Sequence, residues 1–573
     1  MPRIDMPSRY LNLTELTITR SPVADAENAT EKNASCIDAP GIDSTDIDAP
    51  EIFAQVQALN GAVLLDTCKN TLSDGRFDIL SYSPLFTYRF KQQKAKIDMG
   101  QITDTENAQS IDKVKLVHSP FEDLARLHDW FCTAFALSPQ CQSKTDELPF
   151  LAGAIGLFAY DINTLTDHIQ DDAPNQYALD DIAVGFYSRS LIFDNIDNKV
   201  YFVHPTVAEN QYRLQTRKSA NTQKPKHTPH SLGKADIDWL DRLGLSVSTD
   251  KIKDNKVSCE FAKAKTKSHV IESGFSLTSE WQSNMTRAQY HQNMQKIDAY
   301  LRAGDCYQVN FAQRFSATYT GSEWDAYLRL RKINKAPFSC FMRLKKSVVL
   351  SVSPERFLQL KEGKVITKPI KGTRKRAKNA DEDAALAEQL LHSEKDRAEN
   401  LMIVDLLRND LSKHCKAHSV KVPHLFKLES YPAVHHMVST VVGELKDDSN
   451  PFLLLSGAFP GGSITGAPKV RAMQIIQELE PDKRAIYCGS IGYVGIRDDM
   501  DTNICIRTLL AENQRLYCWA GGGIVLDSEA EDEYQESFHK VSKILPSLAE
   551  TRSKWDENET KSEINHQINK SKV

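Results

Sequence analysis

The sequence lacks the cysteine pattern that would indicate a disulfide framework or a zinc site. It contains 11 cysteines in 573 residues, but they are scattered, odd in number and include no C-x-x-C pair. This usage favours reduced, structural thiols and a cytoplasmic protein. No apolar run reaches the roughly 18 residues of a membrane-spanning helix, and residues 1–5 begin no apolar signal-peptide core. We therefore expect no membrane partner.

A strong excess of charge of one sign is also missing. The formal net charge is −5, from 71 Lys and Arg against 76 Asp and Glu. The sequence therefore provides no basic face of the kind that binds nucleic acid, and we expect no nucleic-acid partner. The hydrophobic content of 41% is ordinary for a globular protein, and the length allows two to four domains.

Changes in composition divide the chain into five parts. The segment at 23–50 is rich in Asp, Ala, Asn and Ser and repeats Ile-Asp-Ala-Pro, which is typical of a disordered insertion. The stretch at 205–270 is basic and polar and has few aromatic residues, which predicts a connector that holds one short helix near 235–243. The predicted parts are an N-terminal strand with the acidic insertion (1–50), an N-terminal region (51–204), a variable connector (205–284), a compact domain (285–548) and a charged tail (549–573).

A predicted β-hairpin brings one glutamate towards one lysine. Extended segments flank a turn at 362–364, so the strand that follows Glu355 pairs with the strand that leads to Lys371. With a three-residue loop, Lys361 faces Val365 and Glu355 lies opposite Lys371, with Cβ atoms roughly 4.5–5.5 Å apart. A two-residue loop would shift the register by one. The pair is either an amine nucleophile beside a carboxyl acid/base or an ordinary surface ion pair.

Two predicted helices carry acidic residues three positions apart. Asp396 and Glu399 share one helix face, which becomes apolar two turns further on, at Ile403 and Leu406. Glu533 and Glu536 repeat this spacing with Lys540, beside an apolar stripe. Inward carboxylates suit Mg²⁺, which takes one or two carboxylates together with water and substrate oxygens. The alternative is that both are solvated acidic faces at helix starts.

Two glycine-rich runs and one arginine are candidate anion sites. The run at 461–469 lacks the G-K-[ST] ending of a P-loop, but its free N–H groups and hydroxyls can form an anion cradle before a helix. The glycines at 521–523 follow a predicted strand and offer bare N–H groups, although either run could be a tight turn. Arg507 sits inside an apolar strand pattern and needs an anionic partner. His435 and His436 are either core residues or neighbours of a leaving hydroxyl.

Several motifs in order resemble those of the chorismate-utilising enzyme family, strongly over 285–548 and more weakly over 51–200. The motifs are Ala-Gly-Asp-Cys-Tyr-Gln-Val-Asn (303–310), Ser-Pro-Glu-Arg-Phe (353–357), Pro-Ile-Lys-Gly-Thr (369–373), Ala-Glu-Asn (398–400), Val-Asp-Leu-Leu-Arg-Asn-Asp (404–410), Gly-Ala-Pro-Lys-Val-Arg-Ala-Met (466–473) and Gly-Gly-Gly-Ile-Val (521–525).

The resemblance implies an α/β (α+β) fold in which large antiparallel sheets form a sandwich with helices outside and the active site between the sheets. It also implies a reaction. Family members that aminate chorismate to 4-amino-4-deoxychorismate, for p-aminobenzoate and folate synthesis, have lysine at the position of Lys371, and the anthranilate-forming lyases typically have alanine. An aminating transferase is therefore expected. The alternatives are an anthranilate-forming lyase and a non-catalytic tryptophan-binding subunit.

The resemblance also implies roles for individual residues. Lys371 is expected to be the nucleophile on the chorismate ring and Glu355 the general acid/base. Mg²⁺ is expected on Glu399 and Glu536, with Asp396 and Glu533 in the outer shell. The expected substrate-binding residues are Tyr487, Arg507, Gly521, Gly522, Gly523, Thr373 and Lys540.

A tryptophan pocket and a partner subunit complete the expectations. The residues that resemble the family's pocket are Thr67, where the family usually has serine, with Asp74, Gly75, Arg76, Phe77, Pro337, Phe338 and Ser339. Tryptophan is a possible structural ligand there. No cysteine lies in a recognisable amidotransferase nucleophile elbow, and Cys306 is interpreted as structural. Ammonia is therefore expected from glutamine through a separate glutamine amidotransferase subunit.

Overall fold

The computed structural model describes most of the chain. The described residues are 9–20, 47–69, 75–100, 114–117, 119–138, 147–162, 169, 175–207, 232–248, 256–262, 274–431 and 434–549. Most of the predicted acidic insertion, much of the predicted connector and the predicted charged tail lie outside these residues, and so does Asp74.

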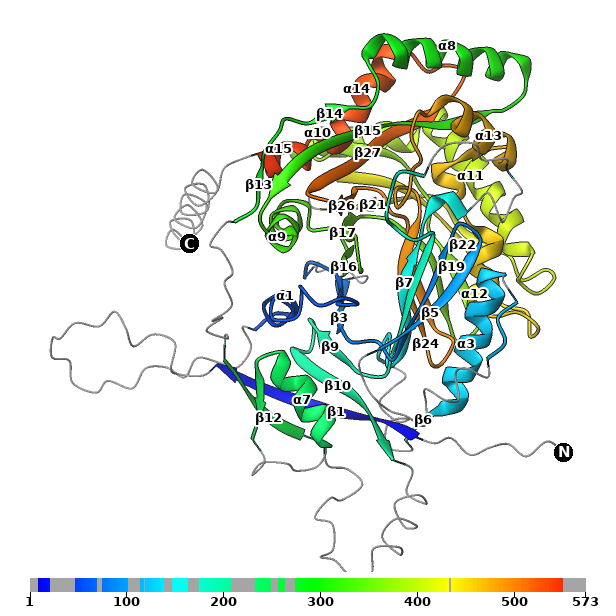
Figure 1. Ribbon diagram of the computed structural model, residues 1–573. Coiled ribbons are helices and arrows are strands. Elements are labelled where there is room, and N and C mark those ends of the chain that lie inside the picture. The colour runs from blue at the N-terminus through cyan, green and yellow to red at the C-terminus, as the bar shows by residue number, and fades with distance from the viewer. Residues whose placement is uncertain are drawn as a thin grey trace, which may run out of the picture.

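The larger of two sheets has 16 strands and runs through both halves of the sequence (Figure 1). Its main path is β11 (Leu245–Val247), β12 (Lys256–Phe261), β1 (Arg9–Arg20), β10 (Lys199–Val207), β9 (Ser190–Asp194), β3 (Phe77–Ser81), β2 (Val63–Asp66), β16 (Phe338–Arg343), β17 (Val348–Ser353), β26 (Thr508–Glu512), β27 (Arg515–Ile524), β15 (Gln308–Thr320) and β13 (Ser276–Leu277). The short strands β14 (Gln282–Ser283) and β23 (Gly466–Ala467) pair with β15, and β6 (Phe135–Leu137) pairs with β1.

The smaller sheet has 11 strands. Its path is β20 (Ile370–Lys375), β22 (Val434–Glu444), β19 (Lys364–Thr367), β18 (Arg356–Lys361), β25 (Met500–Asn503), β24 (Ser490–Gly495), β7 (Gly153–Phe158), β8 (Ile182–Tyr187), β4 (Phe86–Lys91) and β5 (Lys94–Met99), with β21 (Lys421–Ser430) beside β22. Among the described strands, β1 pairs in parallel with β6 and β12, and the other described pairs are antiparallel.

The two sheets pack face to face as a sandwich. One core contains Val349 of β17 and Leu510 of β26 together with Leu157 of β7 and Leu358 of β18, so the inward faces of both sheets share it. A second core contains Leu350 of β17, and helices cover the larger sheet there. The predicted fold of large antiparallel sheets with outer helices is confirmed.

Helices surround the sandwich (Figure 1). The second core takes apolar side chains from α1 (Ala49–Phe53), α7 (Lys234–Arg242), α9 (Glu323–Asn334), α14 (Ala530–Val541) and α15 (Leu545–Ala549). The remaining helices of at least eight residues are α3 (Pro120–Ala134), α8 (Arg287–Ala303), α10 (Ala380–Leu391), α11 (Glu394–Ser412), α12 (Pro451–Ala458) and α13 (Lys469–Leu479). No described helix is both long and apolar enough to cross a membrane.

Three predicted helical segments are confirmed. The short helix expected near 235–243 is α7, whose Trp239 stacks on Tyr82 with ring centroids 4.6 Å apart. The predicted acidic segments are α11 and α14. Ser393 caps α11, because its hydroxyl accepts a hydrogen bond from the backbone N–H of Asp396.

Of the two hairpin registers that the sequence left open, the structure has the one with a two-residue loop, and the register with Glu355 opposite Lys371 is wrong. β18 and β19 pair with Lys361 opposite Lys364, so the loop has two residues, Glu362 and Gly363. Both have positive φ, 50° and 74°, which is the backbone of the tight hairpin turn that matches strand twist. After Thr367 the chain pairs with β22 and no longer with β18. Glu355 and Lys371 are therefore not cross-strand neighbours.

Candidate active site

Two crossings of the chain between the sheets form the centre of the site. β17 of the larger sheet continues through Glu355 into β18 of the smaller sheet. β25 of the smaller sheet continues through Ile504 and Arg507 into β26 of the larger sheet. The crossings are hydrogen-bonded to each other, from Ile504 N to Glu355 O at 3.0 Å and from Val352 N to Arg507 O at 3.1 Å. Glu355 and Arg507 are therefore fixed at one junction between the sheets.

Glu355 is a buried carboxyl with one hydrogen-bond donor. It is 7% exposed, and its Oε1 accepts from the hydroxyl of Ser463 at 3.1 Å. Burial raises the pKa of Glu355 to about 7, against the charge of Lys371 and the Ser463 hydrogen bond, which both lower it. A carboxyl with this pKa exchanges its proton near neutral pH, as a general acid/base requires.

Lys371 reaches the site from a bulge in β20. The pairing of β20 with β22 shifts between Ile370 and Thr373, and Gly372 has φ +82°. The Lys371 ammonium donates to Glu399 Oε1 at 2.6 Å and to the Ser463 carbonyl at 3.2 Å. Because the Ser463 hydroxyl bonds to Glu355, Ser463 bridges the two residues that the sequence expected to pair directly. The structure thus brings them together by a route that the hairpin did not predict.

The glycine-rich run at 461–469 is bonded within the protein. Lys469 forms an ion pair with buried Asp410 at 2.7 Å, and the Thr465 hydroxyl donates to the Gly461 carbonyl at 3.0 Å. With the Ser463 hydroxyl bonded to Glu355, these groups of the run are occupied by contacts within the protein.

The acidic face of α11 points inward. Glu399 is 17% exposed and accepts from both Lys371 and Gln308, the latter at 2.8 Å. Asp396 is 16% exposed and pairs with Arg374 at 3.0 Å. A solvated face is therefore wrong for α11.

The acidic face of α14 is divided between interior and solvent. Glu533 is buried, which raises its pKa, and it accepts from the Ser528 hydroxyl at 2.7 Å. Glu536 is 48% exposed and pairs with Lys540 at 2.7 Å. Although burial opposes ionisation, the ammonium groups of Lys540, Lys395 and Lys371 hold the pKa of Glu536 below its ordinary value. Glu536 of α14 and Lys371 therefore share one electrostatic environment.

Glycines in β27 let both helices approach the strand. A Cβ on Gly522 would lie 2.9 Å from Glu533 and 3.2 Å from Glu536, and one on Gly523 would lie 3.0 Å from Glu399. The carboxylates of α11 and α14 thus converge on neighbouring residues of one strand. Within the described part of the chain, no three His, Cys, Asp or Glu side chains form a metal cage. A divalent cation here would complete its coordination with water or substrate oxygens.

The same glycines lie beyond the end of β26. β27 pairs with β26 up to Cys518, whereas its pairing with β15 continues to Ile524. Among the described strands, the stretch that contains Gly521, Gly522 and Gly523 is therefore paired along one edge. A Cβ on Gly521 would lie 2.0 Å from the Phe311 carbonyl, so no side chain fits there. The Gly521 carbonyl accepts from Lys540 at 2.8 Å.

Arg507 is placed to receive an anion. The prediction that it sits inside a strand is wrong, because it lies in the crossing between the sheets with φ +51° and β26 begins at the next residue. Burial lowers the pKa of Arg507, partly offset by the nearby charge of Glu355. Within the described residues, its guanidinium has no protein ion-pair partner. Tyr487 is also buried between the sheets, parallel to Trp519 with centroids 6.3 Å apart.

Thr373 of β20 lies beside two histidines of β22, His435 and His436, where the two strands pair. The Thr373 hydroxyl is hydrogen-bonded to His436 Nδ1 at 2.8 Å. Burial, with the charges of Arg507 and His435, lowers the pKa of His436 to about 4, so His436 is neutral at physiological pH. His435 is buried and bonded to Ser430 and Asp383. His435 is therefore a core residue, and His436 is bonded to Thr373, one of the predicted substrate-binding residues.

Sequence reasoning assigned no role to Ser463, Gln308 and Lys395. Ser463 lies in the glycine-rich run and Gln308 in the motif at 303–310, so their neighbourhoods gave a signal but their roles depend on contacts. Gln308 is 1% exposed, and its carbonyl oxygen has no partner among the described residues. Lys395 comes one helical turn before Glu399, a spacing that places both on one helix face.

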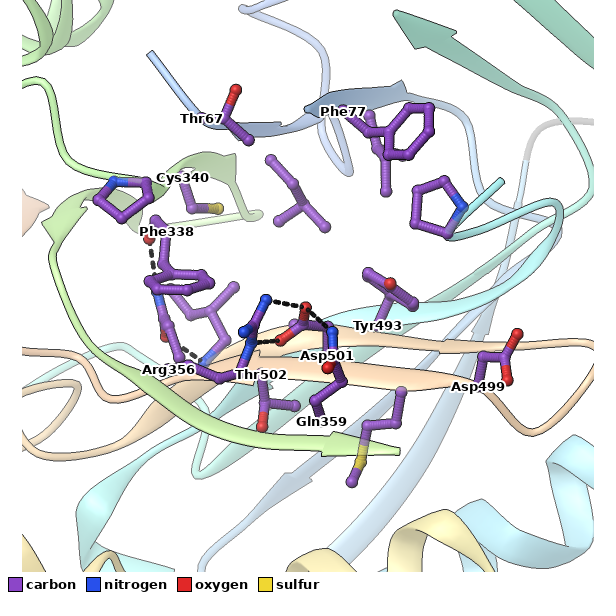
Figure 2. A pocket seen from close by; sticks show the side chains of 18 of the residues that line it. Thr67, Phe77, Phe338, Cys340, Arg356, Gln359, Tyr493, Asp499, Asp501 and Thr502 are labelled. Carbon is purple, nitrogen blue, oxygen red and sulfur yellow. Dashed lines mark hydrogen bonds and ion pairs between the residues drawn. The ribbon is translucent and has the colours of Figure 1, made fainter. Parts of the chain in front are cut away.

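A separate cavity lies between the sheets near β2, β16 and β25 (Figure 2). Its volume is about 300 Å³, within the range of small-molecule sites. The predicted residues Thr67, Arg76, Phe77, Pro337, Phe338 and Ser339 line it. Gly75 accepts from the Thr67 hydroxyl at 3.1 Å, and Asp74 lies outside the described residues. Arg356 also lines the cavity, pairs with Asp501 and covers the Phe338 ring at 4.8 Å from its centroid.

The chain belongs to the family of chorismate binding enzymes, whose model matches residues 85–546. Aminodeoxychorismate synthase component 1 of Salmonella typhimurium is 41% identical over 496 residues, which cover 87% of this chain and 95% of the relative. The Escherichia coli protein of that name is 45% identical, covering 71% of this chain and 79% of the relative. Anthranilate synthase component 1 of Aquifex aeolicus is 31% identical, covering 85% and 89%.

Solved structures show the same fold. Anthranilate synthase component I of Streptococcus pneumoniae superimposes with a TM-score of 0.60 at 28% identity, covering 82% of this chain and 92% of that one. The menaquinone-specific isochorismate synthase of Escherichia coli gives a TM-score of 0.57 at 15% identity, covering 95% of both chains, and is similar in fold alone.

Proposed function

We propose that the chain converts chorismate and ammonia to 4-amino-4-deoxychorismate. The observation that carries the proposal is the joint placement of Lys371 and Glu355 on Ser463, at the junction of the sheets, in a chorismate binding enzyme. The relatives named aminodeoxychorismate synthase component 1 support it by 41–45% identity. Identification of the product by mass spectrometry, from purified chain, chorismate and ammonium, tests it.

The proposed reaction takes place in two displacements. Lys371, as the free amine, forms a bond from its nitrogen to ring carbon C2, the two ring double bonds shift, and the C4–O bond breaks. Glu355 gives its proton to the departing hydroxyl, which leaves as water. Ammonia then forms a bond to C4, the double bonds shift back, and the C2–N bond breaks to restore the lysine amine. The Glu355 carboxylate takes a proton from the new C4 ammonium, so atoms and charge balance.

One carboxylate of the substrate is assigned to a group of residues of the chain. Arg507, Tyr487 and the backbone of 521–523 bind one carboxylate, since Arg507 carries a charge without a protein partner. Thr373 and Lys540 are proposed as further substrate-binding residues, and Lys540 contacts the Gly521 carbonyl. Neutral His436 lies beside Thr373, where it can bond to the leaving hydroxyl without adding charge.

The residues present fit a divalent cation. Glu399 and Glu536 would hold Mg²⁺, with Asp396 and Glu533 behind them, and two ammonium groups already occupy the oxygens of Glu399 and Glu536, at 2.6 and 2.7 Å. Bound Mg²⁺ would supply positive charge to the ring carboxylate. The chain's own contribution is to fix these carboxylates against β27.

The competing activity is anthranilate formation with release of pyruvate, because relatives named anthranilate synthase component 1 are 31–32% identical. The position of the Lys371 amine favours amination over elimination. Detection of anthranilate and pyruvate in place of 4-amino-4-deoxychorismate would reject our assignment.

The partner that we propose is a glutamine amidotransferase subunit in the cytoplasm. Glutamine hydrolysis needs an activated thiolate. The nine described cysteines are free, and burial raises the pKa of each, Cys306 included. Within the described residues, none is therefore suited to release ammonia.

The cavity of Figure 2 is proposed to take tryptophan, whose indole suits its aromatic and proline walls.

A further inference from the structure

One oxygen of Glu399 carries two roles in the proposed reaction. Glu399 Oε1 accepts from the Lys371 ammonium at 2.6 Å, and the same carboxylate is assigned to the cation. The two side chains are 12% and 17% exposed, so water screens their charges weakly. A cation that arrives while Lys371 stays on Glu399 meets a like charge at the same oxygen.

Gln308 keeps Glu399 in position independently of Lys371. Its amide N–H donates to the same Oε1 at 2.8 Å. The carbonyl oxygen of that amide is buried and has no partner among the described residues, which marks it as an acceptor awaiting a donor or a cation. The carboxylate is therefore oriented even when the ammonium leaves, by an amide whose own oxygen is still without a partner among the described residues.

Lys371 also has a second position available. Its ammonium also donates to the Ser463 carbonyl at 3.2 Å, and the hydroxyl of the same residue donates to Glu355. A lysine released from Glu399 would keep this contact with the residue that bonds to the proposed general acid.

We propose that Lys371 and the divalent cation compete for Glu399 Oε1, so that cation binding and release of the nucleophile are one event. This inference rests on the proposed function for its cation. It assigns Lys371 a second role, as the group that holds the cation site closed until the cation displaces it. The Glu536–Lys540 pair is not equivalent, because it is 43–48% exposed and lies on one helix, where such pairs contribute little.

The test is calorimetric titration of the full chain with Mg²⁺ alone, and with Mn²⁺ alone, in the absence of chorismate. Lys371→Met and Lys371→Gln remove the ammonium and should bind either metal roughly tenfold more tightly than wild type. Lys371→Arg keeps the charge and should bind as wild type does. Lys416→Met removes an equal charge from an exposed pair with Asp447 and should change binding less than about twofold.

The carboxylate is identified by a double variant. Lys371→Met combined with Glu399→Gln should lose the tighter metal binding that Lys371→Met shows alone. The competition would be overturned if Lys371→Met and Lys371→Gln bound the metal no more tightly than wild type, or if none of the proteins bound it measurably. It would also be overturned if the tighter binding of Lys371→Met survived the addition of Glu399→Gln. Because chorismate is absent, failure of the proposed reaction would appear in the product assay and leave this comparison unchanged.

Discussion

Lys371 is the residue on which the proposed chemistry depends. Under turnover with chorismate and without ammonia, intact-mass analysis of wild type should show an adduct of chorismate less water. Lys371→Ala should show none, and its amination rate should fall at least 100-fold, because the two-step route needs the amine. Unchanged spectra and rates in the variant would remove Lys371 from the mechanism.

Glu355 should make both activity and stability depend on pH. Its pKa is raised by burial from 4.5 to about 7, so the folded protein binds the proton more tightly than the unfolded chain. Stability due to this group is therefore present at low pH and is lost as pH rises from about 4.5 to 7. The rate should also fall above about pH 7, as the acid form disappears.

The matched variant is Glu355→Gln, followed by urea unfolding at pH 4.5, 6 and 8. As the pH rises from 4.5 to 7, the free energy of unfolding of the variant should increase relative to that of wild type. Above pH 7 the difference between the two proteins should stay constant. A constant difference between the two proteins across this range would mean that Glu355 is not protonated by burial.

The bulge in β20 gives a prediction at the scale of one element. A Cβ on Gly372 would lie 2.8 Å from Leu390 and 3.0 Å from Asp396 on α11, in a backbone with φ +82°. Gly372→Ala should lose about 1–2 kcal/mol of stability and most of the activity, since the bulge aims Lys371. Gly363→Ala is the control, because its φ is +74° but nothing lies within 4 Å. If the two variants kept equal activity, the bulge would have no role in aiming Lys371.

For the whole molecule, the source of ammonia is testable. The purified chain should aminate chorismate with ammonium and not with glutamine, and addition of a glutaminase subunit should confer use of glutamine. Efficient use of glutamine by the lone chain, abolished by Cys306→Ser, would contradict the two-subunit arrangement.

The cavity between the sheets should bind tryptophan. Calorimetry of wild type, or release of tryptophan on denaturation, should detect the ligand, and Phe338→Ala should weaken binding through loss of an aromatic wall. Absence of both signals at millimolar tryptophan would assign the cavity to another ligand.

The sequence predicted the local elements of this structure better than the segments in which the chain crosses between the sheets. The helices α11 and α14 and the spacing of their carboxylates follow from local periodicity, and the structure has them as expected. The hairpin existed but its loop was one residue shorter, because the sequence of a turn does not fix its length. The bridge through Ser463 and the position of Arg507 depend on where the chain changes sheets, which periodicity does not encode.

The bulge in β20 also separates two demands that evolution places on one chain. β20 is the end strand of the main path of the smaller sheet and pairs there with β22, and Lys371 lies outside the apolar clusters of the core. Glu355 and Arg507, by contrast, are built into the crossings that join the sheets. Replacement at 371 would therefore break the ion pair with Glu399 and leave these crossings in place. Under the proposed function, relatives that share one scaffold can diverge in product by changing a residue outside the crossings.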